Sequence, residues 1–146
     1  VYYDYLGPKS NERINITFNY DRIIGDGTIA VESARPINAD VLVKAATPIL
    51  VDVTINIVVE SEFVNSATIV KQNVANAVSA ALRAQKLGTT IDASDLIQVA
   101  YTVTGVDRAR ILFFNEANSA GSVLSITAQK NEYIRPNTVT VIVETR

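Results

Sequence analysis

The chain has 146 residues, of which 48% are hydrophobic and 19% are charged, a composition typical of a globular protein rather than a disordered one. Its net charge is −2 and it contains no run of lysine or arginine, which argues against nucleic acid or an anionic membrane as the main partner. It has no cysteine and no histidine, which excludes a disulfide-stapled scaffold, a Ser-His-Asp triad and a zinc site built on thiolate or imidazole.

The first 38 residues predict a β-rich segment, which we take as part of a larger domain because the chain begins with Val rather than Met. Residues 14–20 alternate apolar and polar side chains, the pattern of a half-buried strand. Residues 23–27 contain Gly-Asp-Gly and predict a turn, and residues 28–33 predict an extended stretch or a short helix. Because proline disfavours a helical residue before it, Arg35-Pro36 marks a join, and we place the domain boundary between residues 38 and 39.

The strongest pattern in the chain is a strand followed by a long helix, between residues 50 and 88. Residues 51–59 alternate between apolar and mostly polar side chains, which predicts a strand with one buried face. From residue 68 the apolar side chains repeat at helical spacing, with Ser66 or Asn65 as N-cap and Gly88 as the residue of positive φ at the end. The expected buried stripe consists of Val70, Val74, Ala77, Val78, Ala81 and Leu82.

The remaining elements predict further strands on both sides of a second helix. Residues 40–46 predict a short strand that Pro48 interrupts at an edge position or a bulge. Asp92 is a good N-cap for a helix that Gly105 ends, and Asp95 at its third position favours the first turn. Strands follow at residues 106–114, 123–128 and 139–144. Residues 39–146 therefore predict an α+β two-layer sandwich, with two consecutive helices packed on one face of a mixed β-sheet.

Several short motifs follow one another in a distinctive order from about residue 14 to the end. They are Arg-Pro-Ile and Ala-Asp-Val-Leu-Val-Lys-Ala within residues 35–45, Val-Asp-Val-Thr-Ile at 51–55, Ile-Asp-Ala-Ser-Asp-Leu at 91–96, Val-Thr-Gly-Val at 103–106, Asn-Glu-Tyr-Ile at 131–134 and the strand at 139–144. This order and spacing resembles the C-terminal part of the J-type baseplate proteins of contractile-tailed bacteriophages. The asparagine-rich strand near residue 15 favours the wedge protein of the T4-like branch.

The resemblance implies a structural virion protein, a subunit of the tail baseplate wedge that is assembled in the host cytoplasm. Its partners would be copies of itself and other wedge proteins, with no enzymatic activity, no cofactor, no nucleic acid and no membrane. An equivalent baseplate component of a tailocin or a secretion apparatus would look the same in sequence. A stand-alone ferredoxin-like ligand-binding module is a different alternative, and it would require a pocket with converging polar side chains.

Six residues are candidates for contacts with partners. Arg108 and Arg110 share one face of a strand, either as an exposed face or edge that arginine protects from unwanted strand pairing, or as a polar interface. Arg35 either anchors the join by a salt bridge or contacts a partner. The remaining candidates form an interface patch or cover a surface of the missing part: Tyr2, Tyr3 and Tyr5.

Overall fold

The structure of the protein, a computed structural model, describes residues 22–34 and 42–144. The chain divides into two compact units, with the division between Lys44 and Ala45. The boundary expected between residues 38 and 39 and the strand expected at residues 14–20 lie outside the described residues.

In the first unit, the described residues form helix α1, Arg22–Ala34. The turn predicted at residues 23–27 is therefore wrong, and of the two alternatives for residues 28–33 the helix is correct. The half-buried residues of α1 include Ile24, Gly27 and Val31, which are spaced as on one face of a helix. Gly25 and Gly27 had favoured a turn instead. The carboxylate of Asp26 lies 3.4 Å from the side chain of Arg22, one turn earlier in the helix.

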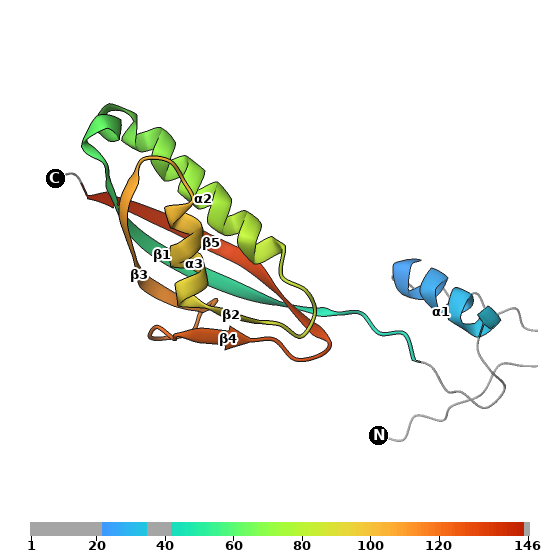
Figure 1. The fold of residues 1–146 in the computed structure, drawn as a ribbon. Coiled ribbons are helices and arrows are strands. Elements are labelled where there is room, and N and C mark those ends of the chain that lie inside the picture. Colours follow the sequence, from blue (N-terminus) through green and yellow to red (C-terminus); the bar gives the residue numbers. More distant parts are fainter. Residues whose placement is uncertain (1–21, 35–41, 145–146) are drawn as a thin grey trace, which may run out of the picture. The chain divides into compact units, whose positions relative to one another are not determined.

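The second unit is built around a three-stranded sheet in the order β3-β1-β5 (Figure 1). The central strand β1, Thr47–Val59, pairs antiparallel with β3, Val106–Glu116, and parallel with β5, Glu132–Glu144. The sheet is therefore mixed, as the sequence predicted. Two short strands, β2 at Thr90–Asp92 and β4 at Ser125–Thr127, form a separate antiparallel pair. The sequence predicted a strand at residues 123–128 but none at residues 90–92.

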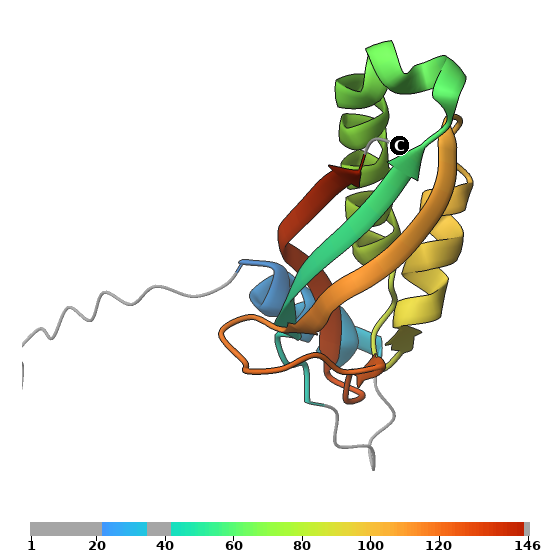
Figure 2. The same ribbon diagram turned by 90° about the vertical axis from the view of Figure 1, so that its left-hand side faces the viewer.

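Two consecutive helices cover one face of the three-stranded sheet (Figure 2). A 3-10 turn, Ser61–Ser66, leads from β1 into α2, Ala67–Arg83, which packs against β5 and β1. The shorter helix α3, Ala93–Tyr101, packs against β3 and against α2. The predicted α+β two-layer sandwich is confirmed.

The hydrophobic core lies between these two layers. Alternate residues of β1 and one stripe of α2 supply most of it, as their periodicities of two and 3.6 predicted. The buried side chains of these two elements are Val51, Val53, Ile55, Ile57, Val59, Val70, Val74, Val78 and Leu82. Ala77 and Ala81, which were expected in the same stripe of α2, are only half-buried.

Several element boundaries differ from the predictions for local physical reasons. The short strand predicted at residues 40–46 is wrong where it is described, since residues 42–46 have no regular structure. Strand β1 begins at Thr47 and includes Pro48, which is tolerated because pairing with β3 starts only at Val51, so that Pro48 lies at a local edge. Strand β5 begins at Glu132, well before residue 139. Its pairing with β1 is irregular between Pro136, the partner of Val51, and Thr138, the partner of Asp52.

The helix ends also combine correct and incorrect predictions. Helix α2 ends at Arg83 and not near Gly88, although Gly88 has the expected positive φ of 67°. The backbone N–H of Gly88 instead donates a 3.0 Å hydrogen bond to the carbonyl of Glu132 at the start of β5. Asp92 is the N-cap of α3, and its backbone N–H donates to the Asp95 carboxylate at 3.2 Å in a capping box, which accounts for this pair of carboxylates.

Candidate functional site

The sheet has a second face, which we call the open face because α2 and α3 lie on the opposite side. In β1, core side chains alternate with side chains that point to the open face. The pairing register brings residues of β3 and β5 onto the same face. The open face consists of Asp52, Thr54, Asn56 and Val58 of β1, Arg108, Arg110, Phe113 and Asn115 of β3, and Thr138, Thr140, Ile142 and Glu144 of β5.

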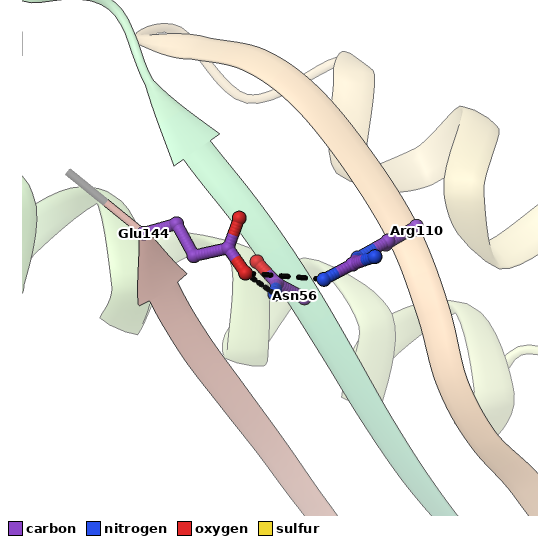
Figure 3. A network of polar contacts seen from close by, with 3 residues as sticks. All are labelled: Asn56, Arg110 and Glu144. Carbon is purple, nitrogen blue, oxygen red and sulfur yellow. Dashed lines mark hydrogen bonds and ion pairs between the residues drawn. The ribbon is translucent and has the colours of Figure 1, made fainter. Parts of the chain in front are cut away.

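A three-residue polar network crosses the open face near the C-terminal end of β5 (Figure 3). The Glu144 carboxylate on β5 accepts a hydrogen bond from the side-chain amide of Asn56 on β1. The same oxygen, Oε1, lies 3.1 Å from Nη2 of Arg110 on β3. Asn56 is only 4% exposed, so its amide needs a partner within the protein, whereas Arg110 and Glu144 lie at the surface. The network therefore ties together all three strands.

A second polar contact stabilises the irregular part of β5. The carboxylate Oδ1 of Asp52 accepts hydrogen bonds from the side-chain amide of Asn137 at 2.7 Å and from the backbone N–H of Thr138 at 3.0 Å. These bonds lie at the point where the register between β1 and β5 shifts. Asp52 thus satisfies a backbone donor that the irregular pairing would otherwise leave to water.

The charges on the open face are sorted by strand. Both arginines lie on β3, and the carboxylates lie on β1 and β5. Arg108 pairs only loosely with its neighbour Asp107, at 3.8 Å, and 68% of its side chain is exposed. The open face is consequently positive along one edge and negative toward the other.

A shallow depression lies at the positive edge of the open face. It is lined by Asn56, Val58, Tyr101, Arg108, Ala109, Arg110 and Glu144.

Tyr101, at the end of α3, accepts a 3.3 Å hydrogen bond from the backbone N–H of Ala109 through its hydroxyl group. The hydroxyl of Ser122 accepts from the N–H of Phe114 at 3.1 Å. Two backbone donors of the edge strand β3 are therefore satisfied by side chains from elsewhere in the unit.

The structure places two of the six predicted site residues. Arg108 and Arg110 share the open face, as their spacing predicted. The other four, Arg35, Tyr2, Tyr3 and Tyr5, lie outside the residues that the structure describes. Asn56 and Glu144 were not among the candidates, because only the pairing of β1 with β5 brings these two residues together.

Residues 22–34 and 42–144 contain no group of three or more metal-ligating side chains that is placed to hold a metal ion. None of the helices in the same ranges is both long and apolar enough to cross a membrane.

No protein-family model matches the chain, and no curated protein matches it either.

Proposed function

We propose that this chain is a structural virion protein, a subunit of the tail baseplate wedge of a contractile-tailed, T4-like phage. It acts through protein–protein interfaces with copies of itself and with other wedge proteins, and not as an enzyme. It binds no cofactor, nucleic acid or membrane, and it reaches the virion after assembly in the host cytoplasm.

The open face is the observation that carries this proposal. A sheet that helices cover on one face leaves its other face open to a partner. That surface combines exposed apolar side chains, such as Ile142 at 42% exposure, with the arginine pair of β3. Interfaces between proteins combine apolar contacts with a polar rim in the same way, and arginine is enriched in them.

The order of motifs supports the choice of a baseplate over other assemblies. Residues 35–45, 51–55, 91–96 and 103–106 follow one another as in the J-type baseplate proteins. A baseplate component of a tailocin or secretion apparatus would have the same order, so this alternative belongs to the same proposal. The genes beside the one that encodes this chain distinguish the two.

One observation favours a second candidate function, a stand-alone ligand-binding module. The depression at the positive edge brings together polar side chains from three strands and from α3, namely Asn56, Tyr101, Arg108, Arg110 and Glu144. This is the convergence that such a module requires. Because Glu144 already pairs with Arg110, only Arg108 of the two arginines in the depression is left to bind an anion.

The proposal is tested by co-expressing the tagged chain with the products of its neighbouring genes and isolating the complexes. We compare the unchanged chain with a variant that carries Arg108→Ala and Arg110→Ala. Both side chains are mostly exposed, so we expect this variant to fold normally but to recover less of its partners. Lys71→Ala with Arg83→Ala, two cations on the exposed side of α2, is the matched control.

The expected result is a complex of several tail proteins that the open-face variant weakens and the control leaves unchanged. Recovery of the tagged chain alone, without partners, would contradict an assembly role. A small molecule that copurifies with the unchanged chain and is lost from the Arg108→Ala, Arg110→Ala variant would instead support the ligand-binding module.

A further inference from the structure

We propose that the open face packs against the open face of a second copy of this chain, about a two-fold axis parallel to β1. The inference deepens the proposed function, because it names the partner of one surface, and it rests on that function only in treating the chain as one that acts through interfaces.

Two opposite charges of the open face, Arg108 and Glu144, lie at matching heights along the strands. Val58 of β1 is paired with Arg108 on one side and with Glu144 on the other. One step along, Asn56 is paired with Arg110 on one side and with Ile142 on the other. A positive and a negative side chain therefore flank Val58 symmetrically, at equal distances from the central strand.

A two-fold rotation about an axis parallel to β1 exchanges the positions of β3 and β5. The axis preserves height along the strands, so Arg108 of one copy faces Glu144 of the other, and the same pair forms a second time by symmetry. The aliphatic part of Arg110 then faces Ile142 of the second copy. Val58 faces its own equivalent on the axis, and so does Asp52, whose carboxylate is already hydrogen-bonded to Asn137 and Thr138 within its own copy. The open face is therefore complementary to itself around Val58, and the pair of Asp52 side chains is the unfavourable contact of this arrangement.

The other in-plane axis, perpendicular to the strands, produces no such match. It places β3 against β3 and β5 against β5, so that Arg108 and Arg110 never meet Glu144 of the second copy. Juxtaposed like charges are costly at an interface, and opposite charges select the orientation of the partners. The two pairs of Arg108 with Glu144 thus favour the axis parallel to β1.

The groups that would pair between copies have free bonding capacity within the described residues. Both bonds that Glu144 accepts there end on Oε1, which leaves Oε2 for a second arginine. Arg108 contacts Asp107 through Nε at 3.8 Å and its side chain is 68% exposed, so the guanidinium is accessible to an oxygen of Glu144 in the second copy.

The size of the surface predicts a weak dimer. Nine residues of β1 pair with β3, a length of about 30 Å, and three strands about 4.8 Å apart span about 14 Å. The flat footprint of about 400 Å² is smaller than the roughly 800 Å² per partner that stable complexes bury. We therefore expect dimerisation that depends on protein concentration and weakens as salt screens the exposed charges.

The decisive experiment mixes two charge-reversed variants of the 146-residue chain and measures molar mass by sedimentation equilibrium. Arg108→Glu alone places two carboxylates opposite each other at both symmetric positions, and Glu144→Arg alone places two arginines there. We expect each variant to dimerise at least about tenfold more weakly than the unchanged chain. In a mixed dimer of the two variants, both positions again hold opposite charges, so the equimolar mixture regains the dimer.

Lys71→Glu on α2 is the matched control, since it makes the same change of charge away from the open face and should leave the dimer unchanged. Circular dichroism establishes that each variant is folded. Three results would overturn the inference: a monomeric unchanged chain at every concentration, a variant that dimerises normally, or a mixture of folded variants that does not.

Cross-linking gives a second test that does not depend on charge. The chain has no cysteine, so Val58→Cys introduces one thiol, on the proposed axis. A short bifunctional thiol reagent should link two copies of this variant, and Ser79→Cys on α2 should give no link above background. Equal linking of both variants would contradict the proposed packing.

These tests separate the inference from the proposed function. If the chain still joins tail complexes while the charge-reversed mixture stays monomeric, the dimer is wrong and the baseplate proposal stands. If the mixture dimerises but the chain joins no tail complex, the dimer is right and the baseplate proposal fails.

Discussion

Arg110 on β3 and Glu144 on β5 form a 3.1 Å ion pair across β1, the strand that separates them. The amide of Asn56 lies below this pair and donates to the same carboxylate (Figure 3). The carboxylate thus has two different partners. One is an exposed cation that water can replace, and the other is a buried amide that water does not reach.

This difference predicts unequal effects of removing the two charged residues. Arg110→Ala should lower the free energy of unfolding by less than about 1 kcal/mol, because the ion pair is exposed. Glu144→Ala should cost about 1–3 kcal/mol, because it leaves the buried amide of Asn56 without its acceptor. Urea-induced unfolding measures both values, and equal losses would show that the amide does not depend on Glu144.

A double-mutant cycle isolates the bond between Asn56 and Glu144. In a chain that already carries Asn56→Val, there is no buried amide to leave unsatisfied, so Glu144→Ala should cost less than in the unchanged chain. The coupling energy from the four unfolding curves should be about 1 kcal/mol. Additive effects would mean that the two side chains do not interact.

The helix face that packs on the sheet is tested by Val74→Asp. Val74 is fully buried, so the substitution places a carboxylate without a partner in the core and should cost at least about 3 kcal/mol or unfold the domain. Asn73→Asp, at the adjacent exposed position, introduces the same group and should change stability little. Melting curves followed by circular dichroism measure both effects. An unchanged midpoint for Val74→Asp would show that a different face of α2 packs on the sheet.

Gly105 is required for two reasons, which a pair of substitutions separates. Its φ is +94°, and an added Cβ would lie 2.9 Å from Cγ of Phe63 and 3.1 Å from Cγ2 of Val70. Gly121 has a φ of +79° but no atom within 4 Å of such a Cβ. Gly121→Ala should therefore cost about 1 kcal/mol from backbone strain alone, and Gly105→Ala should cost clearly more. Equal losses in thermal unfolding would mean that Phe63 moves aside without cost.

Local periodicity was sufficient to predict the core of the second unit. Val74 and Val78 repeat at helical spacing and Val53 and Ile55 alternate in a strand, so each burial pattern follows from a few consecutive residues. The N-cap at Asp92 was predictable for the same reason, because the capping box lies within four residues.

Features that depend on distant residues were not predictable in this way. Asn56 and Glu144 are 88 residues apart in the sequence, and only the parallel pairing of β1 with β5 brings them together. The first part of β5 is polar and contains Pro136, so its local sequence does not predict a strand. Pairing with β1 stabilises this part of the strand. In α1, Gly25 and Gly27 indicated a turn, although the structure accommodates both within a helix.

The most direct test of the central proposal is to locate the chain in purified contractile-tail particles from its source. Antibody raised against the 146-residue chain, detected by gold particles in electron microscopy, should label the end of the tail that carries the baseplate. Particles produced from a genome that lacks the gene are the control and should show no label. Tails that assemble and contract normally, contain none of this protein and bind no antibody would contradict the proposal.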